Sequence, residues 1–148
     1  MKWLVLALLL VAVGGCGSLP RDQERTLERI AETGEVRVGM TAAADQSPHY
    51  ARLSNFLQRS AAAAGGSPRI EIGAAEALLL RLEAGELDLV IGEFDRSSPW
   101  YRRVHLLPPL ATRSAGDSEL EATAAARNGE NGWIMLIERE ARALSSQS

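Results

Sequence analysis

The chain has 148 residues, 46% of them hydrophobic, and a formal net charge of −3 at pH 7. This length suits one ordinary domain, and a mildly acidic chain without a basic stripe is not expected to bind nucleic acid. One cysteine and two histidines are too few for a structural zinc site, and the sequence has no nucleophile elbow, phosphate-binding loop or zinc-protease motif. The sequence therefore predicts no metal, no cofactor and no enzymatic activity.

Residues 1–15 have the pattern of a secretory signal peptide. Lys2 gives the segment a positive start, an unbroken apolar run covers residues 4–13, and the small residues Gly14 and Gly15 follow. An apolar run of about ten residues is roughly half of what a helix needs to cross a bilayer. We therefore expect the segment to direct export and then to be removed.

Cys16, the only cysteine, comes directly after this segment. Residues 13–16 read Val-Gly-Gly-Cys and resemble a bacterial lipobox, in which the peptidase cuts before the cysteine and lipid is attached to it. The resemblance implies a palmitate-bearing lipoprotein of the cell envelope, with residues 16–21 as the lipidated tether, held on a membrane and facing the periplasm or the exterior. The alternative is an ordinary signal peptide followed by an unpaired thiol.

The first part of the expected mature chain alternates between helix and strand patterns. Apolar residues recur at helical spacing in two segments, alternate with polar residues in others, and form a nearly continuous run in one more. In chain order, the expected elements are a helix at 22–32 with Gly34 as its C-cap, a strand at 35–40, a loop at 41–48, a helix at 50–64, a strand at 69–72, a helix from Ala75 to Gly85 and a strand at 87–91.

The remaining part of the chain is less regular. Turn-forming and polar residues separate short apolar segments, and only the last segment has clear helical spacing. The expected elements are a polar, turn-rich segment at 93–100, a short strand at 104–107, a polar linker at 112–119, a weak strand at 120–126, a helix capped by Asn128 or Asn131 and running to Leu144, and a frayed tail at 145–148.

The order strand, helix, strand, helix, strand predicts the fold class. Crossover connections of this length join parallel strands and place helices on the faces of the sheet. Residues 22–144 are therefore expected to form a single α/β domain with a mostly parallel sheet and helices on both faces.

Several conspicuous side chains are expected to be structural. Asp88 interrupts an apolar run and is expected to pair or to cap a turn at the start of the strand, with a ligand-pocket carboxylate as the alternative. Trp133 and Met135 lie in the last helical segment and are expected to pack on the domain. His49 and His105 have no nucleophile pattern near them and are expected in loops or on the surface.

Four stretches of the chain together match the order of elements in a known family. They are residues 26–39, residues 79–92, which read LLRLEAGELDLVIG, residues 98–104 and residues 128–139. They resemble the bacterial extracellular solute-binding proteins of family 3, the amino-acid-type receptors of ABC transporters. In order, they look like the family's opening helix and first strand, its second helix and third strand, the segment that follows, and the final helix of a subgroup. The resemblance implies one lobe of a type II periplasmic-binding-protein-like fold, with a small polar solute and a membrane permease as partners.

The chain departs from the family at the second lobe and at the ligand-holding residues. About twenty residues separate Leu110 from Glu130, where an inserted lobe would need several times as many, so the resemblance is to a single-lobe variant. The family's Thr-x-x-Arg, which holds the ligand's carboxylate, corresponds to Ser97 and Trp100, so the arginine clamp is missing there. The nearest substitutes are Arg96, Arg102 and Arg103.

Ligands of open α/β sheets bind outside the carboxyl ends of the strands, so we expect a ligand site at that edge. The candidate ligand-binding residues are Met40, Thr41, Tyr50, Glu93, Ser97, Ser98 and Trp100. The expected function is binding of a small amino-acid-type solute in transport or sensing. The alternatives are an envelope lipoprotein that has lost solute binding and contacts other proteins, and a decayed gene product without activity.

Overall fold

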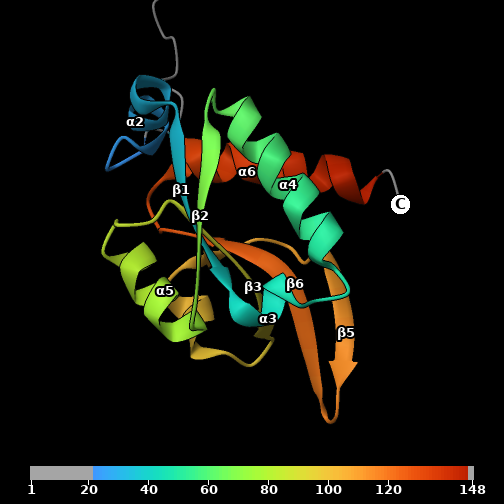
Figure 1. The fold of residues 1–148 in the computed structure, drawn as a ribbon. Coiled ribbons are helices and arrows are strands. Elements are labelled where there is room, and N and C mark those ends of the chain that lie inside the picture. The colour runs from blue at the N-terminus through green and yellow to red at the C-terminus, as the bar shows by residue number, and fades with distance from the viewer. Residues whose placement is uncertain (1–21, 147–148) are drawn as a thin grey trace, which may run out of the picture.

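The computed structural model describes residues 22–146, which are built around one six-stranded sheet (Figure 1). The strand order is β2-β1-β3-β6-β4, and β5 also pairs with β6. The predicted signal peptide at 1–15 and tether at 16–21 lie outside the described residues. The strands are β1 (Glu35–Thr41), β2 (Ser67–Gly73), β3 (Leu89–Asp95), β4 (His105–Leu106), β5 (Ala111–Ala115) and β6 (Ser118–Ala126). The helices are α2 (Thr26–Thr33), α3 (Ala42–Asp45), α4 (Tyr50–Ala63), α5 (Ala75–Glu83), the 3₁₀ helix η1 (Pro99–Arg102) and α6 (Asn131–Ser145).

The parallel half of the sheet is the part that the sequence predicts. Strand β1 pairs in parallel with β2 on one side and β3 on the other, and α4 and α5 make the crossover connections. The other half is antiparallel, because β6 runs against β3, and β4 and β5 run against β6. The predicted α/β class is confirmed, with a parallel core of three strands inside a mixed sheet.

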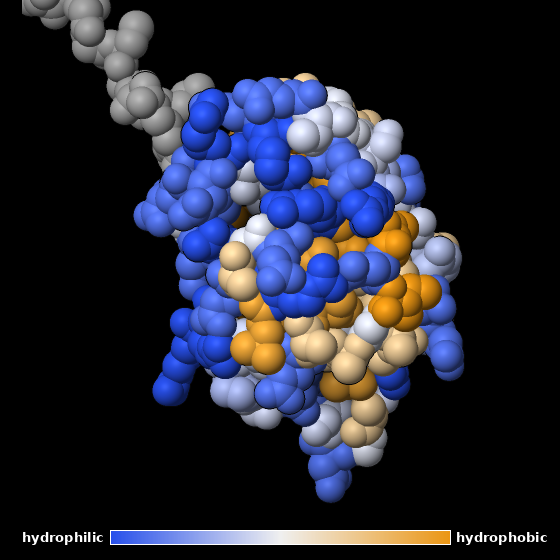
Figure 2. Space-filling model, turned by 60° about the vertical axis from the view of Figure 1, so that its left-hand side comes forward, coloured by the Kyte–Doolittle hydropathy of each residue, from blue (hydrophilic) through white to orange (hydrophobic). Residues whose placement is uncertain are grey.

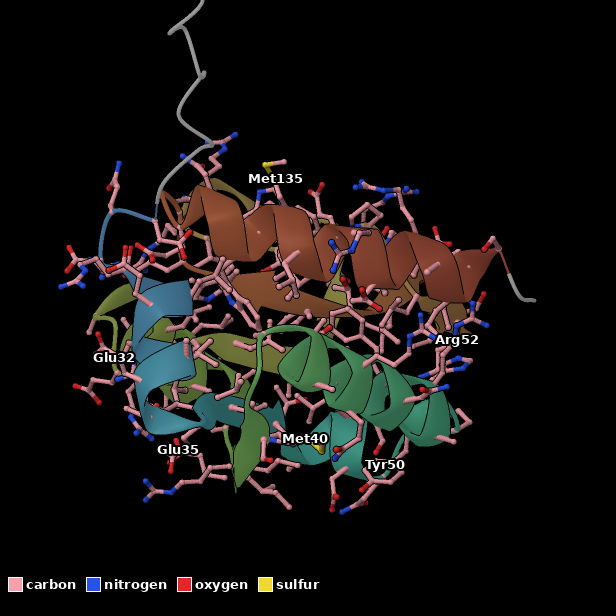
Figure 3. All side chains as sticks on the ribbon, turned by 90° about the horizontal axis from the view of Figure 1, so that it is seen from above. Glu32, Glu35, Met40, Tyr50, Arg52 and Met135 are labelled. Atoms are coloured by element: carbon pink, nitrogen blue, oxygen red, sulfur yellow. The ribbon has the colours of Figure 1, made fainter. Side chains whose placement is uncertain are left out.

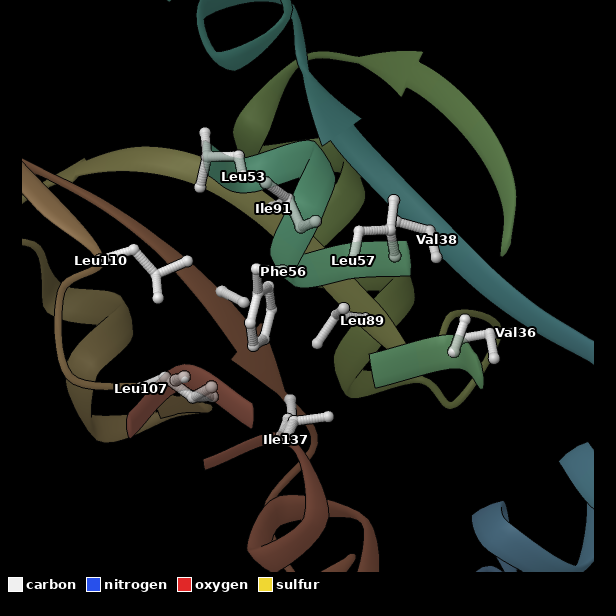
Figure 4. Close-up of a cluster of buried hydrophobic side chains, with 14 of the residues drawn as sticks. Val36, Val38, Leu53, Phe56, Leu57, Leu89, Ile91, Leu107, Leu110 and Ile137 are labelled. Carbon is white, nitrogen blue, oxygen red and sulfur yellow. The ribbon is translucent and has the colours of Figure 1, made fainter. Parts of the chain in front are cut away.

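The central strand β3 contributes to a hydrophobic core on each face of the sheet, because successive side chains of a strand point to opposite faces. Leu89 and Ile91 lie in a core covered by α2, α4 and α6 (Figure 4). Val90 and Phe94 lie in a second core covered by α5. The helices therefore cover both faces, as predicted.

Helix α6 buries the face that its apolar spacing predicts. Met135 is an exception, since its side chain is 52% exposed. It lies two residues after Trp133, about 200° around the helix and therefore on the opposite side. The helix includes Ser145, which the sequence placed in a frayed tail, and residues 147–148 lie outside the described part. The buried residues of α6 are Trp133, Ile137, Ala141 and Leu144.

Helix α2 begins at Thr26, four residues later than predicted. The carboxylate of Asp22 accepts the backbone N–H groups of Leu27 and of Trp133, each at 2.9 Å. Asp22 therefore joins the starts of two helices and does not extend α2. The predicted C-cap is confirmed, since Gly34 has φ 68° and donates its N–H to the last turn of α2. None of the helices within residues 22–146 has the length and apolar composition that crossing a bilayer requires.

Residues 112–119, predicted to be a polar linker, form most of a β-hairpin. Strand β5 pairs with β6 from Ala111 to Ala115, and the two strands are joined by a turn at Gly116 and Asp117. Gly116 has φ 62°, which tight two-residue hairpin turns require. The polar sequence of this strand does not predict a strand, because its structure depends on cross-strand packing and not on local propensity. The hairpin extends away from the body of the domain (Figure 1).

Two other predicted segments differ locally. The loop predicted at 41–48 contains the short helix α3, because the hydroxyl of Thr41 accepts the N–H of Ala44 at 3.2 Å and caps the turn. The strand predicted at 104–107 is reduced to the two residues of β4, which pair with the end of β6.

Candidate functional site

The carboxyl ends of β1 and β3 lie side by side at one edge of the sheet, next to α3. Met40 is buried in the hydrophobic core, and Thr41 is buried with its hydroxyl used as the cap of α3. Tyr50 lies at the outer rim, at the start of α4, and its side chain is exposed (Figure 3). Of these three predicted residues, two are therefore covered and one is accessible.

Glu93, near the carboxyl end of β3, holds two polar partners at this edge. Its Oε2 accepts hydrogen bonds from Arg113 Nε at 2.9 Å and Nη2 at 2.6 Å, and its Oε1 accepts one from the hydroxyl of Ser47. The Glu93 side chain is 1% exposed, whereas the Arg113 side chain is 38% exposed. The pair therefore presents its guanidinium to solvent and keeps its carboxylate inside.

The surroundings of Glu93 lower the pKa of its carboxyl group below the ordinary value of 4.5. Burial raises this pKa, but the hydrogen bonds from Arg113 and Ser47 and the charge of Arg113 lower it more. Glu93 is therefore ionised at neutral pH, with its charge balanced by the guanidinium from β5.

A second polar group lies beyond the end of β3. Asp95 Oδ1 accepts the backbone N–H of Ser97 at 2.7 Å and its hydroxyl at 2.5 Å. Glu121 accepts the hydroxyl of Tyr101 and lies 3.1 Å from Arg96 Nε. Burial and the hydrogen bond to Glu121 raise the pKa of Tyr101 to about 12, so its hydroxyl donates at neutral pH. These contacts hold Ser97 and Arg96 locally, and no metal-binding cluster is found among residues 22–146.

Trp100 lies on the other face of the sheet from Glu93. It packs against the core that α5 covers, and the guanidinium of Arg103 stacks over its ring at 4.2 Å from the centroid. Arg103 also pairs with Glu83. Ser98 accepts the N–H of Trp100 at 3.4 Å and caps η1. Trp100 therefore does not share a face of the sheet with Glu93, and the hydroxyl of Ser98 is used in capping η1.

Sequence reasoning missed the two partners of Glu93. Ser47 belongs to the loop predicted at 41–48, which follows β1 at this edge of the sheet, so its position near the site could have been inferred. The position of Arg113 could not be inferred in this way. It depends on the β-hairpin, which the polar sequence at 112–119 does not predict. The substitutes considered for the family's clamp take other partners, since Arg96 pairs with Glu119 and Glu121 and Arg103 pairs with Glu83.

A hollow of about 210 Å³ lies at the opposite, amino edge of the sheet. Its walls include Arg29, Arg37, Arg127, Asp88 and Glu130. Asp88 pairs with both Arg29 and Arg37, which confirms the structural role predicted for it. Glu130 accepts two backbone N–H groups at the start of α2. The charges that line this hollow are thus used in holding the elements together.

No protein-family model matches the sequence, and no curated protein matches it. Solved structures do match. A single-residue mutant of the arginine-bound domain 1 from TmArgBP has a TM-score of 0.68 at 17% identity, over 81% of this chain and 98% of that chain. An amino acid ABC transporter substrate-binding protein from Streptococcus pneumoniae, bound to L-arginine, has a TM-score of 0.66 at 9% identity, over 82% and 92%. An ancestral cationic amino acid solute-binding protein has a TM-score of 0.66 at 10% identity, over 82% and 94%.

These similarities establish the fold. The described part of the chain has the α/β architecture of one lobe of a periplasmic binding protein, which confirms the predicted resemblance at the level of fold. The matched proteins are mostly binding proteins, and one ancestral amino-acid-binding protein among them is described as a precursor of cyclohexadienyl dehydratase.

Proposed function

We propose that the chain is a lipoprotein of the cell envelope, anchored through lipid on Cys16, whose single lobe binds a small amino-acid-type solute for transport or sensing. The fold supports a solute-binding role, and the resemblance of residues 13–16 to a lipobox supports the anchor. The observation that carries the proposal is the pair formed by Glu93 and Arg113 at the carboxyl edge of the sheet. A membrane permease is the partner that such a role requires.

The pair has the chemistry to receive an amino acid. An amino acid carries an ammonium and a carboxylate, which are complementary to the carboxylate of Glu93 and the guanidinium of Arg113. Arg113 is half-exposed and presents a planar fork of donors, the geometry that binds a carboxylate with two hydrogen bonds. In this proposal Arg113 of β5 supplies the cation that the family places where this chain has Trp100.

A single lobe leaves one side of the solute in water. Polar contacts are weaker there than in an enclosed site, so we expect affinity in the micromolar to millimolar range. The solute also has to displace the contact between Glu93 and Arg113, and the cost of breaking this contact makes the free energy of binding less favourable.

Arg113→Gln tests the solute site, because glutamine keeps one donor but loses the charged fork. Isothermal titration of the full chain, purified from bacterial membranes in detergent, against the standard amino acids should show binding that weakens about tenfold or more in the variant. Arg59→Gln is the matched control, since Arg59 is 37% exposed and pairs with Glu140 on α6, away from the site. Absence of binding to the wild-type chain, or equal loss in both variants, would reject the solute site.

Cys16→Ser tests the anchor independently of any solute. In a bacterial host the wild-type chain should incorporate a palmitate analogue and sediment with the membranes, whereas the Cys16→Ser variant should do neither. Ser18→Ala, two residues further on, is the control and should behave like the wild-type chain. If the variant is labelled and sediments as before, the anchor is not at Cys16.

A second candidate function is contact with other envelope proteins without solute binding. Apolar side chains exposed on β2, at the edge of the sheet, favour it, because exposed apolar surface often marks an interaction site. A solute screen without any response, together with a stoichiometric envelope partner in a pull-down, would support this alternative.

A further inference from the structure

Strand β2 ends the sheet on one side and exposes two isoleucines. It pairs only with β1 among the strands of residues 22–146. Ile70 is 43% exposed and Ile72 is 58% exposed, and both lie beside β1 residues of the α4-covered face, Val38 and Met40. Figure 2 shows the side of the molecule that carries α5, where hydrophobic surface gathers below a band of hydrophilic residues. Edge strands of monomeric proteins are usually protected by charge, bulges or covering elements, so this edge is suited to pairing with another strand.

The backbone of β2 indicates which groups are free to pair. The N–H of Ser67 donates to the carbonyl of Gly34 at 2.9 Å, at the point where β2 joins β1. In a parallel ladder every second residue turns its N–H and C=O toward the neighbouring strand. Residues 67, 69, 71 and 73 therefore face β1, and residues 68, 70 and 72 turn their backbone groups outward. Ile70 and Ile72 thus combine an apolar side chain with outward backbone donors and acceptors.

We propose that β2 pairs with the β2 strand of a second copy of this chain, antiparallel and about a twofold axis, with Ile70 opposite the partner's Ile70. The two Ile70 residues exchange both of their backbone hydrogen bonds. The N–H of Ile72 then donates to the carbonyl of the partner's Pro68, and Pro68, which has no N–H, ends the ladder. The sheets of the two copies join into one continuous sheet.

Charge complementarity selects this register. Opposite residues of an antiparallel pair lie on the same face, so Arg69 stands opposite the partner's Glu71, and this happens twice about the axis. The two adjacent allowed registers place Glu71 opposite the partner's Glu71 or Arg69 opposite the partner's Arg69, and both set like charges against each other. Arg69 and Glu71 now make surface pairs with Glu35 and Arg81, which are weak enough to be exchanged for cross-strand pairs.

A strand-to-strand contact of this size is below the area of a standard stable interface, so we expect a weak dimer with a dissociation constant in the micromolar range. Sedimentation equilibrium of the full chain in detergent should show a concentration-dependent dimer. Ile70→Lys should abolish the dimer and leave the melting temperature of the monomer unchanged. Leu80→Lys, on an exposed apolar residue of α5, is the matched control and should leave the dimer intact.

Charge exchange tests the register. Arg69→Glu or Glu71→Arg alone should weaken the dimer about fivefold or more, and the double variant, which restores opposite charges, should recover it. Under oxidation Ile70→Cys should form an intermolecular disulfide readily and Glu71→Cys should not, because opposite residues are about 5.5 Å apart between Cα atoms. The unmodified chain, whose only cysteine is Cys16, gives the background.

Three outcomes would overturn the proposal. The chain remains monomeric at about 100 µM, well above the expected dissociation constant. Glu71→Cys crosslinks in place of Ile70→Cys. Ile70→Lys leaves the dimer unchanged. Alternatively, the chain does not self-associate, and Ile70→Lys removes its binding to a different envelope protein.

Discussion

Asp88→Ala is expected to lower the free energy of unfolding by about 3 kcal/mol, since removing one partner leaves buried charges uncompensated. Asp88 is buried at the start of β3, and its Oδ2 accepts the backbone N–H of Arg37 at 2.7 Å. The guanidinium of Arg37 lies 2.7 Å from Oδ1, and Arg29 pairs with Oδ2 at 2.5 Å. Both arginines are partly exposed and recover some solvation in the variant, which keeps the cost below the upper end for a fully buried ion pair.

Urea unfolding at pH 7, followed by circular dichroism, measures the effect. Asp88→Asn, which keeps the shape and one acceptor but not the charge, should fall between the wild-type chain and Asp88→Ala. Glu35→Ala removes an exposed partner of Arg69 at 3.4 Å and should change the free energy by less than about 1 kcal/mol. If the alanine variants of Asp88 and Glu35 are equally stable, Asp88 has no role in holding α2 to the sheet.

The case of Asp88 illustrates what the sequence can determine. A single acid inside a buried apolar run has to find a partner, so its structural role follows from the cost of an unpaired buried charge. The parallel strands and their crossover helices can be predicted equally directly. The spacing of apolar residues within each segment is enough to identify the face that it buries. The same holds for the buried face of α6. Met135 was wrongly expected to pack on the domain, and the predicted cap at Asn128 or Asn131 is also wrong, since Glu130 stands at the N-cap without a side-chain hydrogen bond.

The hairpin and the partners of Glu93 could not be predicted in this way. Strand β5 is polar, and it becomes a strand because β6 pairs with it through a tight turn at Gly116. The position of Arg113 beside Glu93 depends on that long-range pairing, and neither residue indicates the other in the sequence. Glu93 thus lies at the edge of the sheet where the sequence predicts a ligand site, but its charged partner comes from a segment expected to be a linker.

The hairpin also determines where Arg113 lies. It takes up most of the segment between Leu110 and Glu130, where the resemblance implies that a two-lobed chain would need several times as many residues. Here β5 and β6 are joined directly, so the two strands remain paired along their length and hold Arg113 against Glu93.

Trp133→Ala is expected to cost about 4 kcal/mol, the largest effect of a single substitution that we predict. Trp133 is fully buried, with 0% exposure, at the start of α6. Its indole Nε1 donates to the backbone carbonyl of Asp88 at 2.8 Å, and its backbone N–H donates to Asp22 at 2.9 Å. Truncation therefore leaves a large cavity in the core and a buried carbonyl without its donor, while the contact to Asp22 survives because it uses the backbone.

Two further variants separate the cost of the cavity from the cost of the lost hydrogen bond. Trp133→Phe fills most of the cavity but lacks the indole donor, so its cost of about 2 kcal/mol reports mainly the lost hydrogen bond to Asp88. Met135→Ala, on the exposed side of the same helix, should change the free energy by less than about 0.5 kcal/mol. Equal stability of the alanine variants at 133 and 135 would contradict the packing of α6 on the sheet. A Trp133→Phe variant as stable as the wild-type chain would instead mean that the link from α6 to the start of β3 contributes nothing, and that α6 is held by its apolar face alone.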